Sequence, residues 1–150
     1  MNYLEELEKM KAVLEQLDYK CEVLRKSTDL PLDMLSVMIG EDGDSQQYLT
    51  IAIYPMQDGL DDSKFVQFYF QAPFEISMDN LGKVLAKIQQ VNRQLPLGHF
   101  NLSAEVDKLY YKYVLTVPRD MEWKPKFLSD IMDMCVYSNR GFLAEFEKTL

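Results

Sequence analysis

The chain has 150 residues, of which 47% are hydrophobic and 12% aromatic, so it can bury a sizeable core within one domain. Its net charge of −8 and its pI near 4.6 argue against nucleic acid and against an anionic membrane surface as partners, because both attract clustered Lys and Arg. Such acidity suits a soluble protein that presents an apolar surface to another protein.

The N-terminal sequence predicts a cytoplasmic protein. Residues 1–9 carry Glu5, Glu6 and Glu8 where a secretory signal needs basic and then purely apolar residues, and no apolar run is long enough to span a membrane. Cys21 and Cys135 are far apart and match no zinc or redox spacing. We expect both thiols to be reduced and mostly buried, with a disulfide as the less favoured alternative.

The first predicted element is an amphipathic helix over residues 2–17. Its apolar positions recur at spacings of three and four, as one helical face requires. They are Tyr3, Leu4, Leu7, Met10, Leu14 and Leu17, whereas the solvent side receives Glu5, Glu6, Glu8, Lys9 and Lys11. The apolar stripe must pack on this domain's own sheet or on a second copy of the chain.

Strands are predicted next, from the alternation of apolar and polar residues. Residues 19–25 give a weak strand pattern, whereas residues 34–39 and 48–54 predict an antiparallel hairpin around a turn at residues 40–44. A polar loop over residues 55–64 precedes a strand at residues 65–70, which residues 71–74 are expected to end.

The segment over residues 77–117 organises the rest of the predicted fold. It starts with a helix that has Ser77 as its N-cap and whose buried face holds Leu81, Val84, Leu85, Ile88, Val91 and Leu95. Pro96 stops this helix, and Gly98 takes a left-handed turn into a strand hairpin.

A last helix begins near Pro125, and the Arg140-Gly141 pair permits a kink or a break in it. One face of this helix is apolar: Leu128, Ile131, Met132, Cys135, Phe142, Leu143 and Phe146. Because helices and strands segregate along the chain, we predict a single α+β domain over residues 1–150 with an antiparallel sheet.

The sequence contains no motif for catalysis or metal binding. His99 is the only histidine, follows a Pro-Leu-Gly turn, and is assigned a structural or exposed role. The aspartates at residues 42, 44, 58, 61 and 62 lack the register of a calcium loop. Phosphate-binding glycine loops, nucleophile elbows and the zinc-protease motif do not occur. We therefore predict no enzyme, no cofactor and no metal.

Tyrosine and methionine are the residues with a potential binding role. Their favoured interpretation is a core with a half-covered sheet, and the alternative is a groove or dimer face for another chain. If a partner binds, the exposed members of one set are the candidate contacts: Tyr48, Tyr54, Tyr69, Tyr111, Tyr113 and Met132.

Four segments carry a resemblance to a known family, and they are residues 30–31, 65–74, 91–98 and 110–115. The most specific is the Asn-Arg-x-Leu-Pro-x-Gly element at residues 92–98, which leads into a strand containing Phe100. These segments resemble the YbjN-type family, whose fold is that of the type III secretion chaperones. The resemblance extends from the first helix through the last.

The resemblance implies an α-β-β-β-α-β-β-α order, and residues 19–25 are the one mismatch, interpreted as a strand that pairs at an edge. It implies a bacterial regulator without catalytic residues. We expect Asn92 and Arg93 to be structural, with Asn92 bonding across the turn. The function predicted is a non-enzymatic, protein-binding regulator or adaptor. The alternatives are a dimeric secretion chaperone that holds a client and, third, a small-ligand sensor.

Overall fold

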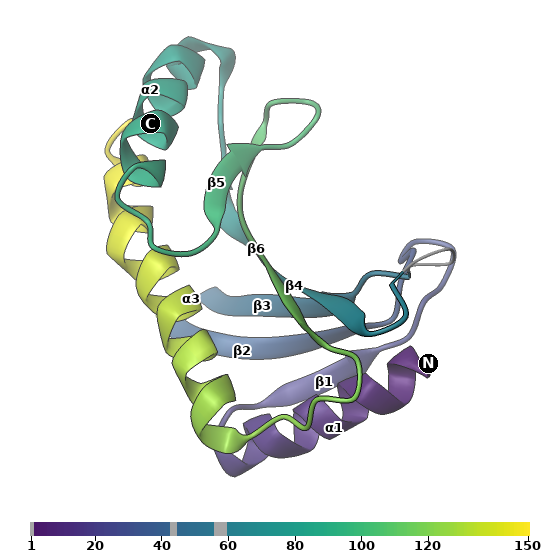
Figure 1. Cartoon of the computed structure of the whole chain (residues 1–150). Coiled ribbons are helices and arrows are strands. Elements are labelled where there is room, and N and C mark those ends of the chain that lie inside the picture. Colours follow the sequence, from purple (N-terminus) through teal and green to yellow (C-terminus); the bar gives the residue numbers. More distant parts are fainter. Residues whose placement is uncertain (1, 43–44, 56–59) are drawn as a thin grey trace. The chain divides into compact units, whose positions relative to one another are not determined.

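The computed structural model describes residues 2–42, 45–55 and 60–150, and it shows an α+β protein with a six-stranded sheet of order β1-β2-β3-β4-β6-β5 (Figure 1). The chain divides into two compact units. Unit 1 comprises Met1–Phe68 and Val114–Met132, and unit 2 comprises Tyr69–Tyr113 and Asp133–Leu150. The single domain over residues 1–150 stays a prediction.

The elements within unit 1 begin with helix α1 (Tyr3–Gln16), followed by strands β1 (Cys21–Leu24), β2 (Met34–Asp42) and β3 (Ser45–Ile53). The unit also holds residues 63–68 of β4 (Ser63–Glu75), residues 114–118 of β6 (Lys108–Pro118) and the first turns of α3 (Pro125–Glu147). Asn2 caps α1, because its Oδ1 accepts a hydrogen bond of 3.1 Å from the Glu5 N–H. The weak strand pattern at residues 19–25 is confirmed as β1, which pairs with β2 at the edge of the sheet.

The predicted hairpin is confirmed by antiparallel pairing of β2 with β3, in which Leu35 faces Ile51 and Val37 faces Leu49. Of the turn assigned to residues 40–44, positions 43 and 44 lie outside the described residues, as do residues 56–59 of the predicted loop. The expected end of the next strand was wrong. β4 continues through Pro73 to Glu75, and alternation persists there, with Ala72 buried between exposed Gln71 and Pro73. A proline is compatible with a strand where its missing N–H would have no partner.

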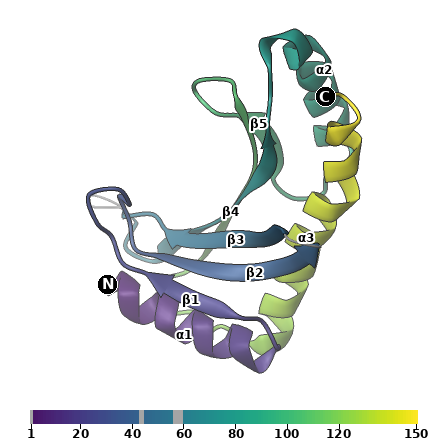
Figure 2. The same cartoon turned by 180° about the vertical axis from the view of Figure 1, so that it is seen from behind.

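One face of the unit 1 sheet forms the core with α1. Apolar side chains that alternate along β2 and β3 are fully buried, as are those of the helix: Leu35, Val37, Leu49, Ile51, Leu7, Met10 and Leu14. Both views of the fold show α1 running alongside β1 (Figures 1 and 2). The intervening residues of these strands point to the opposite face, where most are only half-buried.

Unit 2 contains a short 3-10 helix (Met78–Asn80), helix α2 (Leu81–Asn92), strand β5 (His99–Leu102), and the remaining parts of β4, β6 and α3. Ser77 occupies the N-cap position of the 3-10 turn, but its side chain makes no capping bond, and Asn80 is the N-cap residue of α2. Leu85 was misplaced, since it is 49% exposed. α3 starts at Pro125 as predicted and continues through Arg140-Gly141 without a break.

The Asn92 side chain joins the end of α2 to β5, as expected from the sequence. Its Oδ1 accepts a hydrogen bond of 2.8 Å from the Phe100 N–H, and its Nδ2 donates one of 3.0 Å to the Phe100 carbonyl. Asn101 Oδ1 accepts a hydrogen bond from the Leu102 N–H at 2.8 Å. These side-chain amides therefore form hydrogen bonds with the outward-facing backbone groups of β5, which is an edge strand of the sheet. A further strand could otherwise pair with those groups.

Replacing Asn92 by Ala is expected to lower the free energy of unfolding by about 1–3 kcal/mol, because two backbone groups of Phe100 lose their partners. Asn92→Asp restores only the acceptor and should recover only part of the loss. Chemical denaturation measures both variants, with Gln94→Ala as the control, since Gln94 is exposed on the same turn. A loss no greater than that of the control would show that the Asn92 bonds contribute nothing to stability.

Candidate protein-binding surface and the buried Glu6 cluster

Two of the six predicted contact residues are core residues. Tyr111 and Met132 are both fully buried, so they do not satisfy the condition of exposure under which they were selected. The Tyr111 hydroxyl donates a hydrogen bond of 2.9 Å to the Leu97 carbonyl, and its ring packs 5.4 Å from that of Phe100. Burial, followed by the neighbouring Cys135, raises the pKa of Tyr111 above its usual range. Tyr111 is therefore a structural residue of unit 2.

Tyr48 and Tyr54 lie on the sheet face of unit 1 that points away from the core. Tyr48 is 42% exposed and directly faces Met38 across β2 and β3. The Tyr54 hydroxyl donates a hydrogen bond of 2.7 Å to Gln67 Oε1, which places β4 side chains on the same face. We call this surface the open face of unit 1, and it consists of Met34, Ser36, Met38, Tyr48, Thr50, Tyr54, Phe65, Gln67 and Val114.

The edge of unit 1 next to this face is formed by β1. The Met38 N–H donates to the Lys20 carbonyl at 3.0 Å, so the even-numbered residues of the strand direct their backbone groups toward β2. Because these groups alternate in direction, those of Cys21 and Val23 point outward. Over the part of the chain that the structure describes, neither residue has a backbone partner on that side.

In unit 2, Tyr69 and Tyr113 are half-buried, and Tyr69 stacks on Tyr110 with ring centroids 5.4 Å apart. His99 is exposed, in line with its predicted role, and its ring meets that of Tyr110 edge-on at 6.5 Å. Burial, followed by the charge of Tyr110, raises the pKa of Tyr69. Tyr110 was not among the predicted contact residues, because only the strand pairing brings these three rings together.

The cysteines are free, as predicted. Cys135 is fully buried, and burial raises the pKa of its thiol to about 12. Cys21 is half-buried, and burial followed by the charge of Glu15 raises its pKa to about 11. Both thiols are therefore protonated and poorly nucleophilic near neutral pH.

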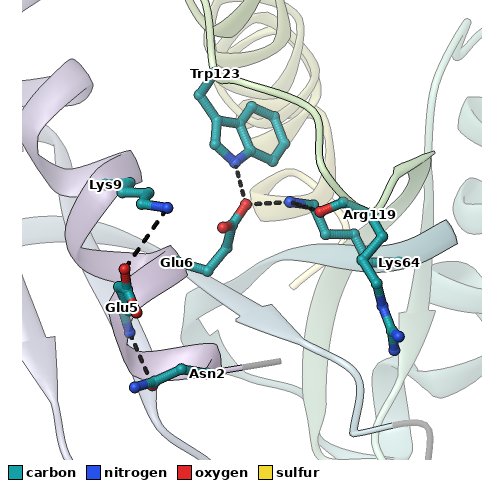
Figure 3. A network of polar contacts seen from close by, with 7 residues as sticks. All are labelled: Asn2, Glu5, Glu6, Lys9, Lys64, Arg119 and Trp123. Atoms are coloured by element: carbon teal, nitrogen blue, oxygen red, sulfur yellow. Dashed lines mark hydrogen bonds and ion pairs between the residues drawn. The ribbon is translucent and has the colours of Figure 1, made fainter. Parts of the chain in front are cut away.

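A buried polar cluster in unit 1 contradicts two predictions. Glu6 was assigned to the solvent side of the first helix and Lys64 to a polar loop, yet Glu6 is 9% exposed and Lys64 is 4% exposed within β4. The Lys64 ammonium forms an ion pair and hydrogen bond with Glu6 Oε1, and the Trp123 Nε1–H donates to the same oxygen at 2.9 Å (Figure 3). Lys64 also donates to the Arg119 carbonyl at 3.1 Å and lies 5.7 Å from the centroid of the Trp123 ring.

The family model of YbjN, described as "Putative bacterial sensory transduction regulator", matches residues 6–133. The chain belongs to the YbjN family. The resemblance predicted from the sequence is thus confirmed, and the family description supports a regulator at a coarse level. No protein with a curated description matches the chain.

Among solved structures, the crystal structure of YbjN from E. coli, titled a putative transcription regulator, is similar to this YbjN-family chain. The two share 8% sequence identity, the match covers 93% of this chain and 92% of the other, and the TM-score is 0.48. No helix in the described part of the chain is both long and apolar enough to cross a membrane.

The buried cluster of this YbjN-family chain could not be found by motif reading. Its three side chains are separated by 58 and 117 positions in the sequence. Two signals were present, because Trp123 is the only tryptophan and Glu6 directly precedes the core residue Leu7. Neither signal identifies a partner, since the partner depends on which strand lies beneath α1.

Proposed function

We propose that this YbjN-family chain is a non-enzymatic regulator that acts by binding another protein on the open face of unit 1. One observation carries the proposal. Tyr and Met side chains remain half-exposed on this face, whereas the residues that alternate with them are fully buried. Aromatic and Met side chains that stay partly exposed are typical of protein interfaces, because they provide contact area and adapt to the partner's shape.

The chemistry of the face favours an extended or helical segment as the ligand. Met38 and Tyr48 form a cross-strand pair that offers an apolar contact, and Gln67 and Thr50 place polar side chains on the same face. The outward backbone groups of Cys21 and Val23 provide a second attachment for an extended segment, which can pair with them as an additional strand. The net charge of −8 helps to keep such a complex soluble.

The test compares two matched double variants in a tagged pull-down from the native host. Tyr48→Ser with Val114→Ser alters the open face, where these residues are 42% and 38% exposed. Tyr137→Ser with Leu85→Ser likewise removes one tyrosine and one aliphatic side chain from unit 2, where they are 60% and 49% exposed. The captured protein is then purified, and its affinity for each variant is measured by calorimetry.

We expect a partner that binds the wild type and the unit 2 variant equally and binds the open-face variant at least about tenfold more weakly. Melting temperatures should remain within a few degrees, since surface substitutions usually change stability little. Equal binding by both variants would contradict the proposed face. A dimer that holds one unfolded client through other residues would instead favour the secretion-chaperone alternative.

A further inference from the structure

A groove in unit 1 lies between α1 and the segment that joins β6 to α3. Its volume is about 570 Å³, which is within the usual range for small-ligand sites. α1 contributes Glu6, Lys9, Ala12 and Val13, and the joining segment contributes residues 119–123. No member of the open face lines it, so the groove is a separate candidate site.

The Glu6 carboxylate is the buried polar group of this groove. Its Oε1 accepts the hydrogen bonds of both Lys64 and Trp123 (Figure 3). Its Oε2 accepts none from the residues that the structure describes, although Glu6 is only 9% exposed. A carboxylate has about four acceptor positions, and hydrogen bonds to a charged acceptor are stronger than neutral ones. The groove therefore offers an oriented acceptor that the protein itself leaves unused.

The other groups around the groove favour a cation over an anion. Glu122 and Asp120 add exposed carboxylates beside Glu6. The Lys9 ammonium lies 3.8 Å from Glu5 Oε1, and the Arg119 guanidinium points away from Glu6 and Trp123 (Figure 3). Lys9 and Arg119 also line the groove, so the preference for a cation comes from the unused Glu6 Oε2 and from Glu122 and Asp120, which form no ion pair within the part of the chain that the structure describes.

The apolar part of the lining suits an aliphatic stem. Trp123, which is almost fully buried, and half-buried Val13 and Met121 all line the groove. Indole rings attract cations as well as apolar groups, as Lys64 already shows at 5.7 Å from the Trp123 centroid. We propose that this groove binds an alkylammonium or guanidinium group, with its charge on Glu6 Oε2 and its stem against Val13, Met121 and Trp123. A free amine and a Lys or Arg side chain of a partner share this chemistry.

The experiment uses the indole N–H of Trp123, which is the only tryptophan and is hydrogen-bonded to Glu6. Its resonance in a proton–nitrogen NMR spectrum is followed while the full chain is titrated with n-butylguanidinium. n-Butanol and n-butyrate are the matched controls, because they share the stem and lack the positive charge. We expect a saturable shift whose Kd is at least about tenfold lower for the cation than for the alcohol, and no saturable shift with butyrate.

Two variants test the position of the site. Ala12 is exposed at the groove, and Lys is a good helix former. Ala12→Lys therefore supplies an ammonium that competes with the ligand without weakening the helix. It should move the Trp123 resonance toward the bound position and weaken n-butylguanidinium binding at least about tenfold, whereas Ala12→Gln should do neither. Glu6→Gln should abolish binding, and the Ala12 pair keeps the test decisive if Glu6→Gln does not fold.

The source of the cation is distinguished by comparing agmatine with a capped Gly-Arg-Gly peptide. Tighter binding of agmatine assigns the groove to a free amine, and tighter binding of the peptide assigns it to a side chain of a partner. Equal shifts with butanol and n-butylguanidinium, or unchanged binding in Ala12→Lys, would overturn the proposal. Failure of the open-face variants to affect protein capture would leave this result intact, because the two sites share no residue.

Discussion

Glu6→Gln and Lys64→Met are each expected to lower the free energy of unfolding by about 3–5 kcal/mol, because each leaves a charged or polar partner buried without its counterpart. For a chain of this length the melting temperature should fall by about 2–4 °C per kcal/mol. Gln retains an acceptor for the Trp123 N–H, so the loss in Glu6→Gln reports mainly the buried Lys64 ammonium. Urea denaturation followed by far-UV circular dichroism measures the change without depending on Trp123 fluorescence.

The double variant provides the control for this prediction. Glu6→Gln combined with Lys64→Met removes both charges, and we expect it to be at least about 2 kcal/mol more stable than the sum of the two single losses predicts. Glu145→Gln serves as a single-variant control, since Glu145 is a half-exposed carboxylate on α3. Single losses below about 1 kcal/mol would mean that the pair is effectively solvated and that our description of it as buried is wrong.

Gly98→Ala is expected to destabilise the protein by about 2–5 kcal/mol, for two reasons that add. Gly98 has φ of +72°, which side chains disfavour. A Cβ at this position would also lie 2.8 Å from the Lys112 carbonyl oxygen and 2.5 Å from the Tyr111 hydroxyl. The Tyr111 hydroxyl cannot move away without losing its hydrogen bond to the Leu97 carbonyl.

Gly141→Ala is the matched control for Gly98→Ala. Gly141 lies inside α3, and a Cβ there would meet no atom within 4 Å. Because Ala has the higher helix propensity, we expect this variant to gain about 0.5–1 kcal/mol. Thermal denaturation compares the two variants directly. If the Gly98→Ala variant had the same melting temperature as the wild type, both the turn geometry and the close packing of Tyr111 would be contradicted.

Local patterns predicted most elements because their causes are local. Gly98 starts the turn into β5 through its own backbone preference, and Pro125 begins a helix for the same reason. The helix predicted to reach Leu95 and stop at Pro96 already ends at Asn92. β4 shows where such a pattern is insufficient. The residues from Gln71 to Phe74 were expected to end a strand, but their alternation continues and the strand extends past Pro73.

Which of the candidate contact residues are exposed depends on how the strands pair and which face of the sheet is covered. Tyr48 and Tyr54 were predicted as contacts and lie on the open face, whereas Tyr111 is buried although its local pattern resembles theirs. Alternation shows that neighbouring residues point to opposite faces, but it does not show which face a helix covers. For Tyr48 and Tyr54 that choice depends on the position of α1 in unit 1, whereas Tyr111 is buried in unit 2 against Leu97 and Phe100.

The sequence by itself determined the α+β class, the family, the acidic character of the chain and the role of Asn92 in the turn, because each depends on composition or on residues close together. Only the tertiary structure decided that Glu6, Lys64 and Trp123 share one buried cluster and that a groove lies beside them. The physical reason is desolvation. The residues next to a Glu in a helix do not reveal its ion-pair partner, and whether the Glu is buried depends on the strand that packs against the helix.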